Sequence, residues 1–333
     1  STRCLEAYAI FHGFNMMTAD VSTAFLHAQE NEKVAMHPPK EWSENHEPGL
    51  LWELIGNLYG RRPAMKNWQT HATTVAESLG CIRGKTDAST YYHPLRKVAI
   101  VLHVDDFDMA GSDEDMKFLM EGFARHLILK VSPVIKVGQS GKFLGRDKIK
   151  IDDGLISVPD DGHINKVLDM LNLQDCRTLS TPGATVPELD DDDIAISDED
   201  KATYMSCVGV LIYLSDDRSD VKFAVKELAR DLQRPTMRSW RALRHCARYL
   251  RGTKGYVMLK RSSGEKPTTI DAFCDTDWAG CRRTRRSTTG VVVSLGGVGV
   301  HTSSKTQASV ALSSGEAEYY GLVSAAAASL YTQ

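Results

Sequence analysis

The sequence has no long apolar run, although hydrophobic residues make up 42% of its 333 residues. A membrane-spanning helix needs about 18 or more consecutive apolar residues, so we expect a chain that buries a core without crossing a membrane. The seven cysteines are scattered and show no C-x-x-C pair or zinc-ligand spacing, which argues against a disulfide framework and a structural zinc site. We expect reduced thiols and an intracellular protein.

The sequence also begins without methionine and without the basic and apolar segments of a signal peptide. Its last residues, up to Gln333, lie within an alanine-rich helical pattern. We therefore expect the chain to be a piece of a longer polyprotein.

An excess of positive charge is missing as well, because 40 lysines and arginines stand against 43 aspartates and glutamates, for a net charge of -3. Nucleic-acid binding usually relies on basic surface, but the basic residues are unevenly distributed. Residues 234–261 contain nine lysines or arginines and no acid. On a helix, four of them share one face, beside an apolar face: Arg241, Arg244, Arg248 and Arg251. The pattern fits either a nucleic-acid-binding stripe or an ordinary solvated helix face.

The most informative segment is an apolar strand pattern over residues 98–104 that leads directly into Asp105 and Asp106 and then turns back. Carboxylates at the end of a buried strand cost free energy unless a cation or hydrogen-bond donors compensate them. Hard divalent cations such as Mg2+ prefer carboxylate oxygens. Other acidic pairs, such as Asp152-Asp153, lie in polar, turn-like sequence where solvation is a sufficient explanation.

A third carboxylate, Asp20, follows a short apolar strand pattern at the point where the strand gives way to a possible helix. Two strand ends that each carry acid could converge in one sheet and share a cation. Alternatively, Asp20 is the N-cap of the helix that follows. The residue pattern alone leaves both interpretations open.

Several motifs occur in a fixed order along the first half of the chain. They are Asp20–Leu26, Leu58–Gly60, Leu102–Asp106 and Phe143–Gly145. In order and spacing they resemble the reverse transcriptase of copia-type LTR retrotransposons. The resemblance continues through residues 180–253, which look like the family's connecting region. Residues 275–280, 287–290 and 313–319 resemble the opening of its ribonuclease H domain.

The alternating helix and strand patterns predict an α+β fold. The resemblance implies a reverse-transcriptase palm and thumb-like domain followed by a truncated ribonuclease H-like α/β domain. The expected divisions are 1–175 for the palm region with truncated fingers, 176–265 for an acidic linker and a helical thumb or connection region, and 266–333 for the N-terminal part of the ribonuclease H-like domain. The linker is predicted from the eight acids between Glu188 and Asp200.

The resemblance implies an RNA-directed DNA polymerase that binds two Mg2+ ions, with Mn2+ as a possible replacement, at Asp20, Asp105 and Asp106. Phe25 is expected beside the incoming nucleotide, with a core aromatic as the alternative. Residues expected at the primer and template are His103, Phe143, Leu144, Gly145, Arg241, Arg244, Arg248 and Arg251. The implied partners are an RNA template, a DNA primer, their hybrid, deoxynucleoside triphosphates and the remainder of the Pol polyprotein, with no membrane. The implied location is intracellular, in a cytoplasmic particle, the nucleus or both.

The sequence departs from the family pattern at three places. Pro63 stands where the family usually has a glutamine beside the incoming nucleotide, and proline has no backbone N–H to donate. The basic fingers segment that binds the triphosphate is expected before Ser1, which leaves Arg61 and Arg62 as speculative substitutes. His103 replaces the usual tyrosine, a milder change because either ring can pack against primer and template.

In the ribonuclease H part, Asp275 and Glu318 match the first two of the four metal-binding acids that the resemblance implies. Glu318 is preferred to Glu316, because residues two apart on a helix point in different directions. Asp277 is expected to be an adjacent or surface acid. The other two acids are expected after Gln333, so we predict that this chain does not cleave RNA.

Two hypotheses from different classes follow. The first is an enzyme, the reverse transcriptase of a copia-like element with a partial ribonuclease H domain. The second is a catalytically inactive retroelement fragment that acts at most as a nucleic-acid-binding module. Three intact acids favour the first hypothesis, whereas Pro63 and the expected truncations favour the second.

Overall fold

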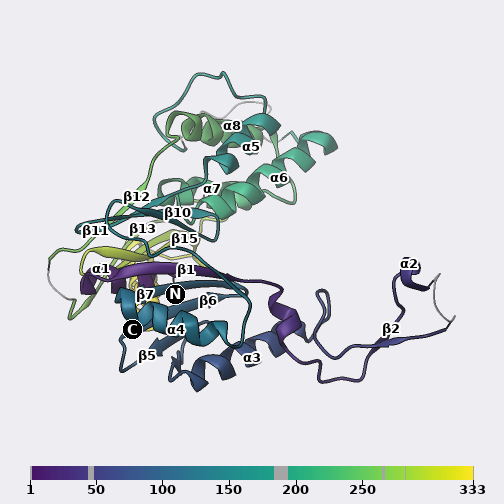
Figure 1. The fold of residues 1–333 in the computed structure, drawn as a ribbon. Helices are drawn as coiled ribbons and strands as arrows, with labels where there is room; N and C mark the ends of the chain where they lie inside the picture. The colour runs from purple at the N-terminus through teal and green to yellow at the C-terminus, as the bar shows by residue number, and fades with distance from the viewer. Residues whose placement is uncertain (1, 44–48, 184–193, 265–266, 282, 333) are drawn as a thin grey trace. The chain divides into compact units, whose positions relative to one another are not determined.

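The computed structural model describes residues 2–43, 49–183, 194–264, 267–281 and 283–332. The chain forms two compact units, residues 1–136 and 137–333, and both combine helices with antiparallel sheets (Figure 1). This mixed architecture agrees with the α+β prediction, while the predicted divisions near residues 175 and 265 stay predictions. Within the described ranges, no helix has the length and apolar character that a membrane crossing requires.

The first unit is built on a six-stranded antiparallel sheet in the order β4-β5-β6-β7-β1-β8. Its strands are β1 (Asn15–Val21), β4 (Ile82–Arg83), β5 (Thr90–His93), β6 (Val98–His103), β7 (Asp106–Gly111) and β8 (Leu129–Val131). Strand β1 lies between β7 and β8, so the start of the chain becomes a neighbour of the β6–β7 hairpin. This insertion positions the candidate site.

Helices α3 (Ala64–Ser78) and α4 (Asp113–Ala124) contribute to the main core of this unit together with one face of the sheet. The alternation of a strand sends Met17, Ala19 and Val21 into that core and therefore sends Asp20 to the opposite face. Helix α1 (Thr2–His12) packs on β6 and β7. Helix α4 begins where the Ser112 hydroxyl accepts a hydrogen bond from the Asp115 amide, as in a standard N-cap.

A long excursion separates β1 from α3. It contains the 3-10 helix η1 (Ala24–His27), β2 (Ala35–Met36), α2 (Lys40–Ser43) and β3 (Trp52–Glu53). Strands β2 and β3 pair antiparallel and extend away from the six-stranded sheet (Figure 1). The excursion returns to the sheet through a backbone hydrogen bond from Asn57 to Ala28, which brings residues 58–63 close to η1.

The second unit opens with a four-stranded antiparallel sheet in the order β12-β11-β10-β9. Its strands are β9 (Ser140–Phe143), β10 (Arg146–Ile151), β11 (Gly154–Val158) and β12 (Met258–Arg261). The turn-like sequence at Asp152-Asp153 forms a hairpin turn, because β10 and β11 pair directly across it.

The helices of the second unit share a second core. They are α5 (Asp161–Met170), α6 (Asp198–Leu214), η2 (Ser219–Val221), α7 (Lys222–Ala229) and α8 (Met237–Gly252). A three-stranded sheet, β13 (Ile270–Asp277), β14 (Thr288–Leu295) and β15 (Val298–Thr306), follows and carries α9 (Ser314–Thr332). The small residues Ala317, Gly321 and Ala325 form the buried stripe of α9.

The predicted extent of the acidic linker needs correction. The acidic linker was expected to continue to Asp200, but Ser197 caps α6 and the acids of 198–200 form its first turn, where the helix dipole favours negative charge. Residues 184–193, the centre of the predicted linker, lie outside the described residues. Helix α9 begins just after Ser313, whose hydroxyl accepts a hydrogen bond from the Glu316 amide.

Candidate functional site

The acid pair predicted at the end of an apolar strand lies at a tight hairpin. Strands β6 and β7 pair with His103 opposite Asp106, so only Val104 and Asp105 form the turn. The strand reaches this turn through buried residues such as Val101 and Leu102, which anchor it in the sheet. Asp105 and Asp106 are both half-buried.

Asp20 meets this hairpin in the sheet, as predicted. It lies opposite Asp106 in the pairing of β1 with β7 and opposite Lys130 in the pairing of β1 with β8. One row across four strands therefore reads His103, Asp106, Asp20, Lys130. Directly opposed residues in an antiparallel sheet have Cβ atoms about 4.5–5.5 Å apart. The N-cap alternative for Asp20 is wrong, because Asp20 lies within β1 and the N-cap of η1 is Thr23.

The charges of this row act on one another. Burial raises the pKa of the Asp106 carboxyl, the negative charges of Asp105 and Asp20 raise it further, and His103 opposes them. Lys130 Nζ lies 4.0 Å from Asp20 Oδ2, but both side chains are substantially exposed, so this ion pair compensates the acids only weakly. The hairpin thus holds an excess of carboxylate oxygens, the donor type that Mg2+ and Mn2+ take.

The residues fit a divalent cation by their chemistry and their strand positions. Across the described ranges, however, the side chains show no set of three or more His, Cys, Asp or Glu residues already grouped as metal ligands. Mutual repulsion among like charges is the physical reason to expect the carboxylates to turn apart.

The aromatic predicted beside the nucleotide, Phe25, lies in η1 and packs half-buried against the core. Its ring centroid is 4.7 Å from that of Tyr59, which is itself exposed. Arg61, considered as a substitute for the triphosphate-binding residues, is instead paired with Glu30 at 3.1 Å and Glu32 at 2.8 Å. The first of these contacts holds the pKa of Glu30 below its usual value. The Arg61 side chain therefore forms ion pairs within the excursion between β1 and α3.

The predicted primer-contacting motif forms the tip of the β9–β10 hairpin in the second unit. Phe143 is buried and pairs with Arg146 across a two-residue turn. Both turn residues, Leu144 and Gly145, have positive φ, at 48° and 75°. The Tyr213 hydroxyl donates to the Leu144 carbonyl at 3.4 Å. The motif is therefore a rigid hairpin tip.

The arginine stripe of α8 is the clearest correction. Arg244 Nη1 donates to the Leu171 carbonyl at 3.0 Å and Arg248 Nε to the Arg177 carbonyl at 2.7 Å. Arg251 donates to the carbonyls of residues 174 and 176. These arginines, and Arg241 beside them, are half-buried rather than exposed. Three of the four arginines thus bind the segment after α5 to the helix. Helical periodicity in the sequence cannot distinguish arginines in this role from arginines on a solvated face.

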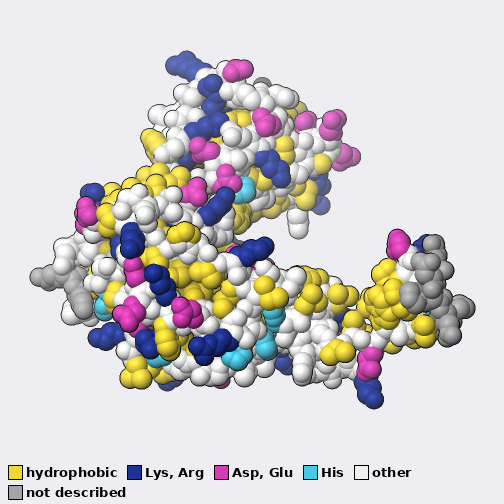
Figure 2. All heavy atoms as spheres, in the orientation of Figure 1, with side chains coloured by type: hydrophobic (Ala, Val, Ile, Leu, Met, Phe, Trp, Pro, Cys, Tyr) yellow, Lys and Arg dark blue, Asp and Glu magenta, His cyan; other side chains and the backbone are white. Residues whose placement is uncertain are grey.

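The surface of this helical region agrees with that correction. Basic and acidic side chains are interspersed on the face shown in Figure 2. A nucleic-acid surface is expected to concentrate lysine and arginine on one face. The arginines of α8 are therefore better described as structural.

Comparison with known proteins supplies the family. A family model described as reverse transcriptase (RNA-dependent DNA polymerase) matches residues 1–185, more than half of the chain. The chain belongs to this reverse transcriptase family.

Three curated relatives extend the similarity beyond that region. The chain is 28% identical over 329 residues to the retrovirus-related Pol polyprotein from transposon RE2 of Arabidopsis thaliana, and 27% identical over 329 residues to that from transposon TNT 1-94 of Nicotiana tabacum. It is 27% identical over 333 residues to the Pol polyprotein from transposon RE1 of Arabidopsis thaliana. Each match covers 96% of this chain but only 22%, 24% and 21% of the relative. The copia-type resemblance is thereby confirmed.

The second predicted acidic site lies beyond residue 185, in the three-stranded sheet and α9. Asp275 is exposed on β13, and Glu318 Oε1 accepts a hydrogen bond from the Thr276 amide at 3.3 Å. Glu318 therefore reaches the residue after Asp275. Glu316 instead accepts hydrogen bonds from the Leu312 amide and the Tyr320 hydroxyl, which supports the choice of Glu318.

The other residues of this region have local structural roles. Asp277 accepts a hydrogen bond from the Thr288 amide, which ties β13 to β14. Residues 282–286 contain four arginines. Of these, Arg282 lies outside the described residues, and Arg283 lies 3.5 Å from the Asp231 carboxylate. Asp277 is therefore the last residue of β13 and is held against Thr288 of β14.

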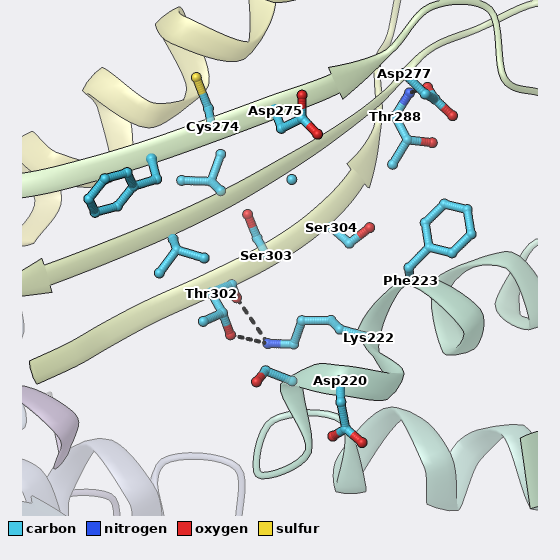
Figure 3. Close-up of a pocket in the computed structure, with 15 residues that line it drawn as sticks. Asp220, Lys222, Phe223, Cys274, Asp275, Asp277, Thr288, Thr302, Ser303 and Ser304 are labelled. Atoms are coloured by element: carbon cyan, nitrogen blue, oxygen red, sulfur yellow. Dashed lines mark hydrogen bonds between the residues drawn. The ribbon is translucent and has the colours of Figure 1, made fainter. Parts of the chain in front are cut away.

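A cavity of about 510 Å³ lies between the start of α7 and the face of the three-stranded sheet that carries Asp275 (Figure 3). Lys222 crosses one side of it and donates to the Thr302 carbonyl at 2.9 Å. Asp220, Asp275 and Asp277 also line it. Three carboxylates against one lysine make the cavity unsuited to a bare phosphate group.

Two residues near the hairpin escaped sequence reasoning. Lys130 enters the row from β8, a strand of only three residues whose pattern carries little signal. Trp68 of α3 donates its indole N–H to the Val104 carbonyl at 2.5 Å. A buried tryptophan in an amphipathic helix reads as core, so its acceptor is visible only in the structure.

Proposed function

We propose that this chain is the polymerase part of a copia-like Pol polyprotein and that Asp20, Asp105 and Asp106 are its catalytic carboxylates. The observation that carries the proposal is the shared row of the sheet, in which Asp20 lies opposite Asp106. Membership of the reverse transcriptase family and similarity to transposon Pol polyproteins supply the reaction: RNA-directed DNA synthesis. The chain spans under a quarter of those relatives, so their full set of activities is not carried over.

In this proposal the three carboxylates bind Mg2+ or Mn2+. When bound, such ions lower the pKa of an attacking hydroxyl and neutralise charge on a departing phosphate. The protein holds Asp20 and Asp106 on paired strands, so their backbones need no reorganisation during the reaction. His103, exposed at the end of the same row, is proposed to pack against primer and template.

The other partners are assigned by family resemblance. Phe25 is proposed beside the deoxynucleoside triphosphate, and residues 143–145 at the primer of an RNA–DNA hybrid. Phe25 supports this through its position in the turn directly after β1 and its exposed neighbour Tyr59. The arginines of α8 are not carried forward as a binding surface, because they hold backbone carbonyls.

We further propose that residues 266–333 are the N-terminal part of a ribonuclease H-like domain in which Asp275 and Glu318 are metal ligands. The hydrogen bond from Thr276 to Glu318 supports their proximity.

The deciding experiment is primer extension on a poly(rA)·oligo(dT) template with Mg2+. The double variant Asp105→Asn, Asp106→Asn is expected to lose at least about a hundredfold in rate, because the carboxylate charges act on the reacting groups directly. The matched control is Asp152→Asn, Asp153→Asn, which changes an exposed acid pair at the β10–β11 turn and should retain the wild-type rate.

If the wild-type chain extends the primer no faster than the Asp105, Asp106 variant, the enzyme proposal fails. The second candidate, an inactive fragment that at most binds nucleic acid, would then account for the fold. Two observations favour that candidate: the commitment of Arg61 to Glu30 and Glu32, and the lack of a ready-made ligand set among the described residues.

A further inference from the structure

We infer that Trp68 is a positioning residue for the carboxylate pair Asp105 and Asp106. It acts through Val104, the strained residue directly before that pair. The inference rests on the proposed function for its consequence in catalysis. The hydrogen bonds behind it do not depend on that function. They are accepted by the carbonyls of the turn residues and donated by Trp68 and Val21.

The turn that carries the acid pair is under conformational strain. With His103 opposite Asp106, the β6–β7 connection is a two-residue hairpin turn. Val104 has φ 56°, whereas Asp105 is not among the residues with positive φ. Positive φ at only the first central residue is the pattern of a type II′ turn, a position that glycine normally occupies. A β-branched residue there is a genuine outlier, which persists only when its surroundings hold it in place.

Two contacts from outside the turn hold it. Trp68 donates its indole N–H to the Val104 carbonyl at 2.5 Å, and the Val21 amide donates to the Asp105 carbonyl at 2.8 Å. Both carbonyls of the turn are therefore fixed by residues far away in the sequence. The Val21 contact comes from the residue after Asp20, so this hydrogen bond also ties β1 to the hairpin.

Trp68 is itself rigid. Its side chain is 1% exposed and belongs to the core formed by α3, α4 and the sheet. Two histidine rings lie near the indole: the ring centroids of His27 and His71 are 6.4 and 6.1 Å from that of Trp68. An indole has one N–H to donate and no acceptor. Trp68 donates this N–H to the carbonyl of Val104, the residue directly before the acids.

The β9–β10 hairpin offers an internal comparison. There the strain of a two-residue turn is shared by Leu144 and Gly145, and the aromatic donor Tyr213 lies 3.4 Å from the Leu144 carbonyl. The turn beside the acids has no glycine and a much shorter contact. The shorter hydrogen bond, from Trp68 to Val104, therefore occurs at the turn that has no glycine to adopt positive φ.

The test is a double-mutant cycle between Trp68→Phe, which keeps a core aromatic but removes the N–H, and Val104→Gly, which removes the strain. Hydrogen–deuterium exchange of residues 98–111 reports the turn, Mn2+ titration reports the carboxylates, and primer extension reports kcat and the KM for the nucleotide. Trp240→Phe is the matched control, because Trp240 is partly buried and packs against the core of the second unit.

We expect Trp68→Phe to speed exchange in residues 98–111, to weaken Mn2+ binding about tenfold and to lower kcat with little change in KM. In the Val104→Gly background the same substitution should change none of these, because a glycine adopts the turn without support. Trp240→Phe should leave residues 98–111 at the wild-type exchange rate.

Two results would overturn the inference: Trp68→Phe matching Trp240→Phe in exchange and Mn2+ affinity, or an equal effect of Trp68→Phe with and without Val104→Gly. If Trp68→Phe fails to fold, replacing Trp68 with benzothienylalanine, which substitutes sulfur for the N–H in the same ring shape, gives the same test. Exchange needs no polymerase activity. If the wild-type chain does not extend primers, the proposed function is rejected. Faster exchange in Trp68→Phe would still support the positioning role of Trp68 in that case.

Discussion

The β6–β7 hairpin and helix α8 both drew attention through their charged residues, and the structure uses those charges in opposite ways. At the hairpin, Asp106 and Asp20 face each other across paired strands, with Lys130 and His103 in the same row. On α8, the arginines turn toward the backbone carbonyls of residues 171–177. One region holds uncompensated charge, and the other has satisfied it internally.

The difference lies in what the neighbouring backbone can offer. Within a sheet the strand carbonyls and amides bind one another, so an acid at a strand end finds few donors. A segment without regular structure leaves its carbonyls free, and a guanidinium with five N–H donors can bind several of them. Like charges that remain together after folding are therefore a better indication of a ligand site than a run of charge in the sequence.

The largest effect that would sharpen this contrast is expected from Arg251→Ala. Arg251 donates to two carbonyls. A hydrogen bond to a charged group contributes about 1.5–3 kcal/mol, and the two bonds together are expected to contribute no more than this because Arg251 is partly exposed to solvent. We expect the free energy of unfolding in urea to fall by about 1.5–3 kcal/mol, with unchanged affinity for an RNA–DNA hybrid. Lys254→Ala, an exposed cation just after α8, is the control and should leave stability near the wild-type value.

The contrast would break if Arg251→Ala left stability unchanged while weakening hybrid binding. In that case the slope of log affinity against log salt should also fall by about one unit, the signature of a lost phosphate contact. The arginines would then return to the role that the sequence suggested.

A smaller effect is expected in the pH dependence of stability. The folded state raises the pKa of Asp106 above its ordinary 3.8, first through burial and then through Asp105 and Asp20. A raised pKa favours folding while the group is protonated, so this contribution is complete below about pH 3.8 and is lost as pH rises through the higher folded value. Asp106→Asn should remove that loss, and unfolding midpoints from pH 3 to 7 measure it.

Asp152→Asn, in the exposed β10–β11 turn, is the matched control for this series. Repulsion at the hairpin is contradicted if Asp106→Asn and Asp152→Asn give superimposable stability curves. A steeper rather than flatter curve for Asp106→Asn would reverse the sign and assign a stabilising partner to this carboxylate.

Sequence reasoning reached the hairpin because apolar strand patterns end at Asp20 and Asp105, and the family motifs reached the same residues. It did not reach Lys130, since register across a sheet depends on pairing between distant strands and β8 has only three residues. It also missed Trp68, whose acceptor lies 36 residues away. The arginines of α8 were misjudged because their acceptors are backbone carbonyls, which every residue has and no side-chain pattern reveals.

The most direct test of the central claim is anomalous X-ray scattering from crystals of the chain soaked in Mn2+. The account predicts an anomalous peak enclosed by the carboxylates of Asp20, Asp105 and Asp106, and the loss of that peak in Asp20→Asn. A peak that persists in Asp20→Asn, or that occurs at Asp275 and Glu318 while the hairpin binds no ion, would contradict it.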